Sequence, residues 1–137
     1  MVSLINEAFE LGYITEEHKK KAEKYKLETG ISDEAVLRDM KLVTEEKLVE
    51  LYQTIYGYET EFEPAEQDGV LVKQFRRQDL LKYEFFPVLA EKKIKLYTAQ
   101  PASLLYVEDL VRDETGYKSG FQYVLTTISA VTDMICL

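Results

Sequence analysis

A seven-residue motif that occurs twice near the N-terminus constrains the fold more than any other feature of the sequence. The first copy reads LGYITEE at residues 11–17 and the second reads MKLVTEE at residues 40–46, so that Thr44 follows Thr15 by 29 residues. In each copy a threonine precedes two glutamates, a pattern typical of a helix N-terminus. The hydroxyl accepts a bond from a free backbone N–H, and the carboxylates favour the positive end of the helix dipole. The repeat therefore predicts two copies of a short helix, a tight turn and a longer capped helix.

Around this motif the sequence predicts a helical subdomain over residues 1–57. Ser3 and Ser32 are the expected N-caps of the two short helices. The helix predicted from residue 16 to residue 29 is strongly polar, so we expect it to pack on one narrow side or to support a partner. The helix that follows Thr44 is more apolar and is the expected centre of this four-helix repeat subdomain.

Residues 58–137 predict a second subdomain in which strands and helices alternate. Residues 58–63 alternate as a short acidic strand around Phe62, and residues 84–99 have the pattern of a hairpin. From these hairpin signals we expect an α+β protein whose second part is a small α/β sandwich with a mostly antiparallel sheet. The other predicted elements are short helical turns near residues 70–75 and 78–82, a helix capped by Ser103, a strand at residues 121–125 and a helix at residues 127–134.

The acidic composition narrows the classes of partner. The 137 residues carry a net charge of −8, and 46% of them are hydrophobic and 31% charged, a balance typical of globular proteins. Nucleic acids and anionic membranes require clustered positive charge, and the one basic run, residues 19–21, lies beside glutamates. No apolar run approaches the roughly 20 residues that span a bilayer. We therefore expect no nucleic-acid partner and no direct insertion into a membrane.

Residues that usually carry chemistry are scarce. Cys136 is the single cysteine and His18 the single histidine, and they lie far apart in the sequence. We expect no disulfide, which suits a reducing cytoplasm, and no Cys–His catalytic pair. The acidic residues between Glu59 and Asp68 are expected to be solvated, with a metal site as the alternative, although no metal-loop spacing is present. The N-terminus lacks the basic and long apolar segments of a signal peptide, so we expect a cytoplasmic protein with no enzymatic activity, no cofactor and no metal.

The order of these motifs resembles a known family, the N-terminal domains of type II secretion ATPases (the E component) and of the related pilus-assembly ATPases. Helical segments of that family read leucine-glycine, apolar residues, then Ile-Thr-Glu-Glu-Gln-Leu, and residues 11–17 and 42–48 are similar to this pattern. The family continues with a tyrosine-glycine junction, an apolar-Pro-apolar strand and a Thr-Gly-Tyr turn. Similar residues here are Tyr56-Gly57, Phe86-Pro87-Val88 and Thr115-Gly116-Tyr117, whereas Gln100-Pro101 stands where the family has Asp-Pro.

The resemblance implies an adaptor role in type II secretion or pilus assembly, that is, in bacterial protein transport. In the secretion ATPases this region precedes the motor and docks onto the cytoplasmic part of an inner-membrane protein. The sequence contains no GxxxxGK[ST] loop, so we expect no nucleotide hydrolysis by this chain. The expected function is therefore a non-catalytic interaction domain, held at the inner membrane through its partner. A partner with an acidic or apolar surface is expected to dock on the polar second helix or on the edge strand around Phe62.

The alternative function that the resemblance implies is a sensor of cyclic di-GMP. Family members that bind this dinucleotide have Arg-Leu-Gly about ten residues before each threonine, where the arginine contacts a guanine or a phosphate. Those places hold Ser3-Leu4-Ile5 in the first copy and Ser32-Asp33-Glu34 in the second, which argues against the dinucleotide. Should it bind, the expected contacts are the turn residues Leu11, Gly12, Met40 and Lys41.

Overall fold

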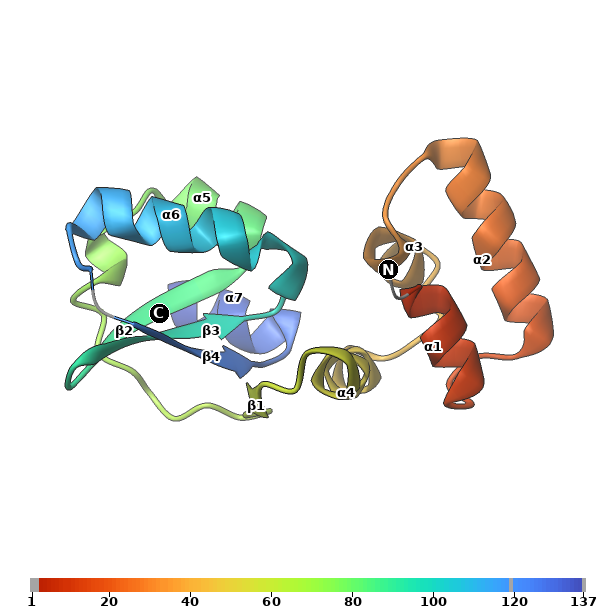
Figure 1. The fold of residues 1–137 in the computed structure, drawn as a ribbon, viewed down its shortest axis with the longest axis horizontal. Helices are drawn as coiled ribbons and strands as arrows, with labels where there is room; N and C mark the ends of the chain where they lie inside the picture. The colour runs from red at the N-terminus through yellow and green to blue at the C-terminus, as the bar shows by residue number, and fades with distance from the viewer. Residues whose placement is uncertain (1–2, 119, 137) are drawn as a thin grey trace. The chain divides into compact units, whose positions relative to one another are not determined.

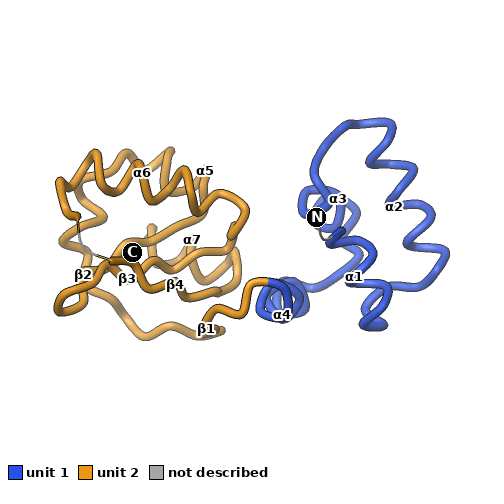
Figure 2. The backbone as a smooth tube through the Cα atoms, viewed as in Figure 1, with its two compact units in different colours: residues 1–55 blue, residues 56–137 orange. Residues whose placement is uncertain are grey.

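The computed structural model describes residues 3–118 and 120–136. The chain divides into two compact units, residues 1–55 and residues 56–137 (Figure 2). The first unit is helical, and the second contains the sheet (Figure 1). The α+β class predicted from the sequence is therefore confirmed.

The first unit contains the four predicted helices. They are α1 (Leu4–Glu10), α2 (Glu16–Thr29), α3 (Asp33–Asp39) and α4 (Glu45–Tyr56), which runs one residue into the second unit. Helices α1, α2 and α3 contact one another pairwise. Fully buried aliphatic side chains form the interior of the unit, among them Ile5, Ala8, Ala22, Val36 and Leu37.

The hydrogen bonds at the helix N-termini repeat with the 29-residue offset of the sequence. The Ser3 hydroxyl accepts from the Asn6 N–H at 3.3 Å, and the Ser32 hydroxyl accepts from the Ala35 N–H at 3.2 Å. In the same way Thr15 accepts from the His18 N–H at 3.1 Å, and Thr44 accepts from the Lys47 N–H at 3.2 Å. All four predicted N-caps are thus confirmed. His18 completes a capping box, since its Nδ1 accepts from the Thr15 N–H at 3.5 Å.

The second unit is built on a four-stranded sheet with the strand order β1-β4-β3-β2. The strands are β1 (Glu59–Thr60), β2 (Phe85–Ala90), β3 (Lys93–Thr98) and β4 (Phe121–Leu125). In the described part of the chain, β2 and β3 are the one antiparallel pair, with Phe85 opposite Thr98 and Ala90 opposite Lys93. Strand β4 lies parallel to both β3 and β1.

The prediction of a mostly antiparallel sheet was therefore wrong. A tight hairpin joins only antiparallel strands, and the turn at residues 91–92 forms one between β2 and β3. Between β3 and β4 the chain instead forms η2 (Pro101–Ser103) and α6 (Leu104–Thr115). A helical crossover returns the chain to the end at which it began, so the next strand runs parallel. The acidic strand is also shorter than predicted, because Phe62 lies beyond the end of β1.

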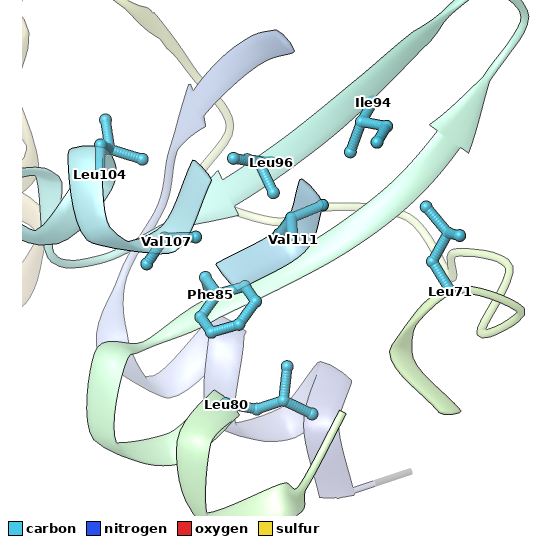
Figure 3. Packing of buried hydrophobic residues seen from close by; sticks show 8 residues of the cluster. All are labelled: Leu71, Leu80, Phe85, Ile94, Leu96, Leu104, Val107 and Val111. Carbon is cyan, nitrogen blue, oxygen red and sulfur yellow. The ribbon is translucent and has the colours of Figure 1, made fainter. Parts of the chain in front are cut away.

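The remaining helices cover the two faces of the sheet (Figure 1). They are η1 (Val72–Gln74), α5 (Arg77–Tyr83) and α7 (Ile128–Cys136), in addition to α6. On one face, side chains from α5 and α6 pack on alternate strand residues (Figure 3). That cluster consists of Leu71, Leu80, Phe85, Ile94, Leu96, Leu104, Val107 and Val111.

The other face of the sheet packs against α7. Phe86, Val88, Tyr97 and Val124 form its buried cluster, with Met134 and Ile135 of α7 partly buried against it. The two clusters thus use alternate residues of β2, as the period-two pattern of a strand requires. Ser103 stands at the predicted N-cap position of α6, but its hydroxyl makes no capping bond and donates instead to the side-chain oxygen of Gln100.

Candidate functional site

The two turns predicted as ligand contacts have the same backbone hydrogen bonds. In the first turn the Tyr13 N–H donates to the Ala8 carbonyl at 2.8 Å, and in the second the Leu42 N–H donates to the Leu37 carbonyl at 3.2 Å. Gly12 has a φ of +79° and Lys41 a φ of +52°, so both residues adopt the left-handed conformation. The second turn therefore keeps its shape without glycine, although a side chain in this conformation costs about 1 kcal/mol.

The turn residues differ in their exposure. Leu11 is 42% exposed. Gly12 and Lys41 are also exposed, and Met40 is half-buried. Leu11 and Met40 each close the last turn of a short helix through a backbone N–H bond, to Glu7 at 2.9 Å and to Val36 at 3.0 Å. These contacts explain the turns as helix ends, and the role of the four residues in ligand binding stays a prediction.

The two segments examined in the sequence for a dinucleotide motif, residues 3–5 and 32–34, contact each other through hydrogen bonds. One carboxylate oxygen of Asp33, at the start of α3, accepts from the Ser3 hydroxyl at 2.8 Å and from the Ile5 N–H at 3.2 Å. The other oxygen lies 2.5 Å from the Lys26 ammonium. The neighbouring Glu34 forms an ion pair with Arg38 at 3.1 Å. Asp33 therefore connects the beginnings of the two repeats. Its carboxylate also accepts the bond from the Ile5 N–H in the first turn of α1.

The hydrogen bonds of Asp33 change its acidity. Partial burial would raise the pKa of this carboxyl, but the bonds from Lys26, Ile5 and Ser3 favour the charged form and together outweigh burial. The pKa of Asp33 is consequently lowered from its ordinary value. The carboxylate is a fixed negative charge at the start of the repeat, where a phosphate would meet repulsion.

On α2, the first predicted docking surface, many of the charged side chains form ion pairs with one another. Ala22 is the buried residue of this helix. Three i,i+4 ion pairs run along its exposed sides, Glu16–Lys20, Glu17–Lys21 and Lys24–Glu28. Exposed pairs of this kind contribute little to binding energy. Lys19, at a place where the second copy has Leu48, keeps its ammonium over the Phe9 ring at 4.7 Å from the centroid.

The second predicted docking residue, Phe62, lies at a groove in the second unit. The groove has a volume of about 760 Å³ and lies between the segment 62–73, the strand residue Phe86 and helix α7. Val72, Met134 and Ile135 line it with half-buried apolar surface. Phe62 is 40% exposed, so a large ring stands uncovered beside the groove.

Carboxylates dominate the charge around this groove. Glu63, Glu66 and Asp133 line it, and Lys73 is the one basic residue among the described residues of the lining. All four side chains are exposed. Within the described residues, no ion pair is formed by any of the three carboxylates.

The sequence predicts one wall of this groove as a surface but not the other. Phe62 and the acidic residues between Glu59 and Asp68 were predicted as surface. Helix α7 was predicted only as a helix at residues 127–134, with no surface role for Asp133 or Met134. No local signal in the sequence pairs residues 128–136, whose single charge is Asp133, with the acidic loop, because the two segments meet only in the fold.

Two classes of site receive no support from the described residues. Among residues 3–118 and 120–136, no three His, Cys, Asp or Glu side chains come together in a way that would hold a metal ion. Over the same residues no helix is both long and apolar enough to cross a bilayer.

Comparison with known proteins gives structural relatives but no sequence relatives. No protein-family model matches the chain, and no curated protein matches it. Among solved structures, the N-terminal domain of XpsE aligns in two crystal forms. It does so with TM-scores of 0.72 and 0.60, at 20% identity, over 97% and 96% of this chain and 91% of the XpsE chain.

The chain has the fold of the N-terminal domain of XpsE. XpsE is a type II secretion ATPase, and the match covers its N-terminal domain rather than a catalytic domain. A structure of MshE with cyclic di-GMP also aligns, with a TM-score of 0.75 at 16% identity over 99% of this chain and 98% of that chain. The predicted resemblance to the N-terminal domains of secretion and pilus ATPases is therefore confirmed at the level of the fold.

Proposed function

We propose that the chain is a non-catalytic interaction domain that docks onto a protein partner, as an adaptor of a secretion or pilus-assembly system. The observation that carries this proposal is the alignment of nearly the whole chain with the N-terminal domain of XpsE. From the resemblance we infer that the partner is the cytoplasmic part of an inner-membrane secretion component. The chain would then act at the cytoplasmic side of the inner membrane, without entering the bilayer.

The surface chemistry of the second unit supports a docking role. Large apolar side chains remain exposed there, such as Phe62 at 40% and Leu105 at 81%. A protein partner can cover such side chains, and apolar anchors in grooves carry much of the energy of interfaces. In the first unit, by contrast, the carboxylates of Asp33 and Glu34 form bonds within the unit and are less available to a partner.

Crosslinking in the native cell followed by affinity purification of the tagged chain tests this function. A protein of the secretion or pilus-assembly machinery should be recovered in stoichiometric amounts with the wild-type chain. Recovery of no protein above the level seen with an unrelated tagged domain of similar charge would refute the proposal.

A sensor of cyclic di-GMP is the second candidate, because the MshE structure that aligns over the full chain contains this dinucleotide. Its contacts would be Leu11, Gly12, Met40 and Lys41. The Asp33 carboxylate at the start of the repeat argues against it, since the site would bring like charges together. Isothermal titration calorimetry with cyclic di-GMP decides between the two: the adaptor proposal expects no heat of binding. Saturable binding that Lys41→Glu abolishes would establish the sensor.

A further inference from the structure

We propose that the groove beside Phe62 receives a basic amphipathic helix of the protein partner. This inference rests on the proposed function, because it assigns the docking surface and the partner chemistry to an adaptor. It starts from an apolar groove whose two walls come from distant parts of the sequence, the segment 62–73 and helix α7.

The apolar interior of the groove sets the first requirement on the occupant. Phe86 is 3% exposed and forms part of the sheet cluster, while Val72, Met134 and Ile135 pack partly against that cluster and leave the rest of their surface in the groove. A volume of about 760 Å³ holds several apolar side chains. An amphipathic helix presents such side chains at i, i+3, i+4 and i+7 along one face. Met134 adapts its unbranched side chain to irregular apolar partners.

The charge around the groove sets the second requirement. Glu63 and Glu66 lie on one wall and Asp133 on the other, so the carboxylates flank the apolar interior on both sides. Lys73 offsets one of them, and none of the three is paired among the described residues. Lysine or arginine at the borders of the apolar face of the occupant would complement this charge. The groove thus favours a cationic partner, in contrast to the acidic or apolar partner expected from the sequence.

A second copy of this chain is a poor occupant for the groove, which requires an apolar face bordered by positive charge. The basic run at residues 19–21 lies on α2, where Lys20 and Lys21 are paired with glutamates of the same helix. The whole chain carries a net charge of −8, which opposes association between two copies through an acidic surface. A helix of a different protein is therefore the occupant to which the proposal commits.

A phage-displayed library of random peptides, each long enough for about four helical turns, tests this inference on the full chain. Peptides that combine lysine or arginine with apolar residues at helical spacing should be enriched. Fluorescence anisotropy then measures the affinity of the leading peptide for three proteins: wild type, the groove variant Glu63→Gln/Glu66→Gln/Asp133→Asn, and a matched control, Glu91→Gln/Asp113→Asn/Glu114→Gln. The two variants change the net charge equally and alter only exposed side chains.

The groove variant should weaken binding about tenfold relative to the control variant, because a few partly desolvated ion pairs together contribute about 1.4 kcal/mol. Added salt should weaken binding to wild type and to the control, and much less to the groove variant. Enrichment of acidic or non-helical peptides, or equal affinity of the two variants, would overturn the inference. If the native partner is recovered equally well by wild type and by the groove variant, the groove assignment fails while the adaptor function stands. Recovery of no partner by either protein contradicts the adaptor function itself.

Discussion

Replacement of Asp33 by alanine tests how the two repeats are joined. The substitution removes the bonds from the Ser3 hydroxyl at 2.8 Å and the Ile5 N–H at 3.2 Å, together with the ion pair to Lys26. Hydrogen bonds to a charged group contribute about 1.5–3 kcal/mol each, but they share one side chain and are not additive. The Asp33 side chain is 13% exposed, so solvent screens it only in part. We expect Asp33→Ala to lower the free energy of unfolding by about 2–3 kcal/mol near neutral pH, since it also strands the part-buried Ile5 N–H.

The pH dependence of this effect follows from the lowered pKa of Asp33. A carboxyl whose folded pKa lies below its unfolded value of about 3.9 stabilises the fold above that value. The contribution disappears as pH falls through the folded pKa. The difference between wild type and Asp33→Ala should therefore be full near neutral pH and shrink below about pH 4.

Urea denaturation followed by far-UV circular dichroism measures this difference, because the first unit is helical and its unfolding lowers the helical signal. Asp113→Ala is the matched control, since Asp113 is an exposed acidic residue of helix α6 in the other unit. Asp33→Asn should be less damaging, because its amide oxygen can still accept from the Ser3 hydroxyl and the Ile5 N–H, while the ion pair with Lys26 is lost. A loss of less than about 0.5 kcal/mol for Asp33→Ala, within the range of ordinary surface substitutions, would refute the reasoning.

Three further substitutions test the local structure of the repeat by thermal and urea unfolding. Thr44→Ala should destabilise the protein by about 1 kcal/mol, because it removes the acceptor of the Lys47 N–H at the start of α4; an unchanged midpoint would mean that this bond adds nothing. Gly12→Ala should cost about 1 kcal/mol because its φ is +79°, and a neutral result would indicate that the turn relaxes. Lys41→Gly should instead stabilise by a few tenths of a kcal/mol up to about 1, since its φ is +52°, whereas destabilisation would show that the lysine side chain stabilises the turn.

The elements that could be predicted are those fixed by chemistry over three or four residues. Ser3, Thr15, Ser32 and Thr44 all cap helices, because a cap needs only a hydroxyl and the N–H three residues later. Ser103 also stands at the start of its predicted helix, but its hydroxyl donates to the side chain of Gln100 in a turn that the pattern did not reveal, so the capping bond is absent.

The direction of the strands could not be predicted from local signals. The hairpin of β2 and β3 is visible in the sequence, but the pairing of β4 with β3 depends on how α6 crosses the sheet. The helix between these strands had been recognised, and its consequence, a parallel pair, follows from the geometry of helical crossovers. The groove could not be predicted from local signals either, since Phe62 and Met134 come together only once the sheet has formed.

The measurement that tests the adaptor function most directly is calorimetric titration of the full chain with a candidate partner. That partner is the purified cytoplasmic domain of the inner-membrane secretion component encoded in the same genome. The proposed function predicts saturable one-to-one binding with a Kd on the order of micromolar or tighter, as expected for a specific protein interface. The absence of binding heat at protein concentrations roughly a hundredfold higher, at more than one temperature, would contradict it.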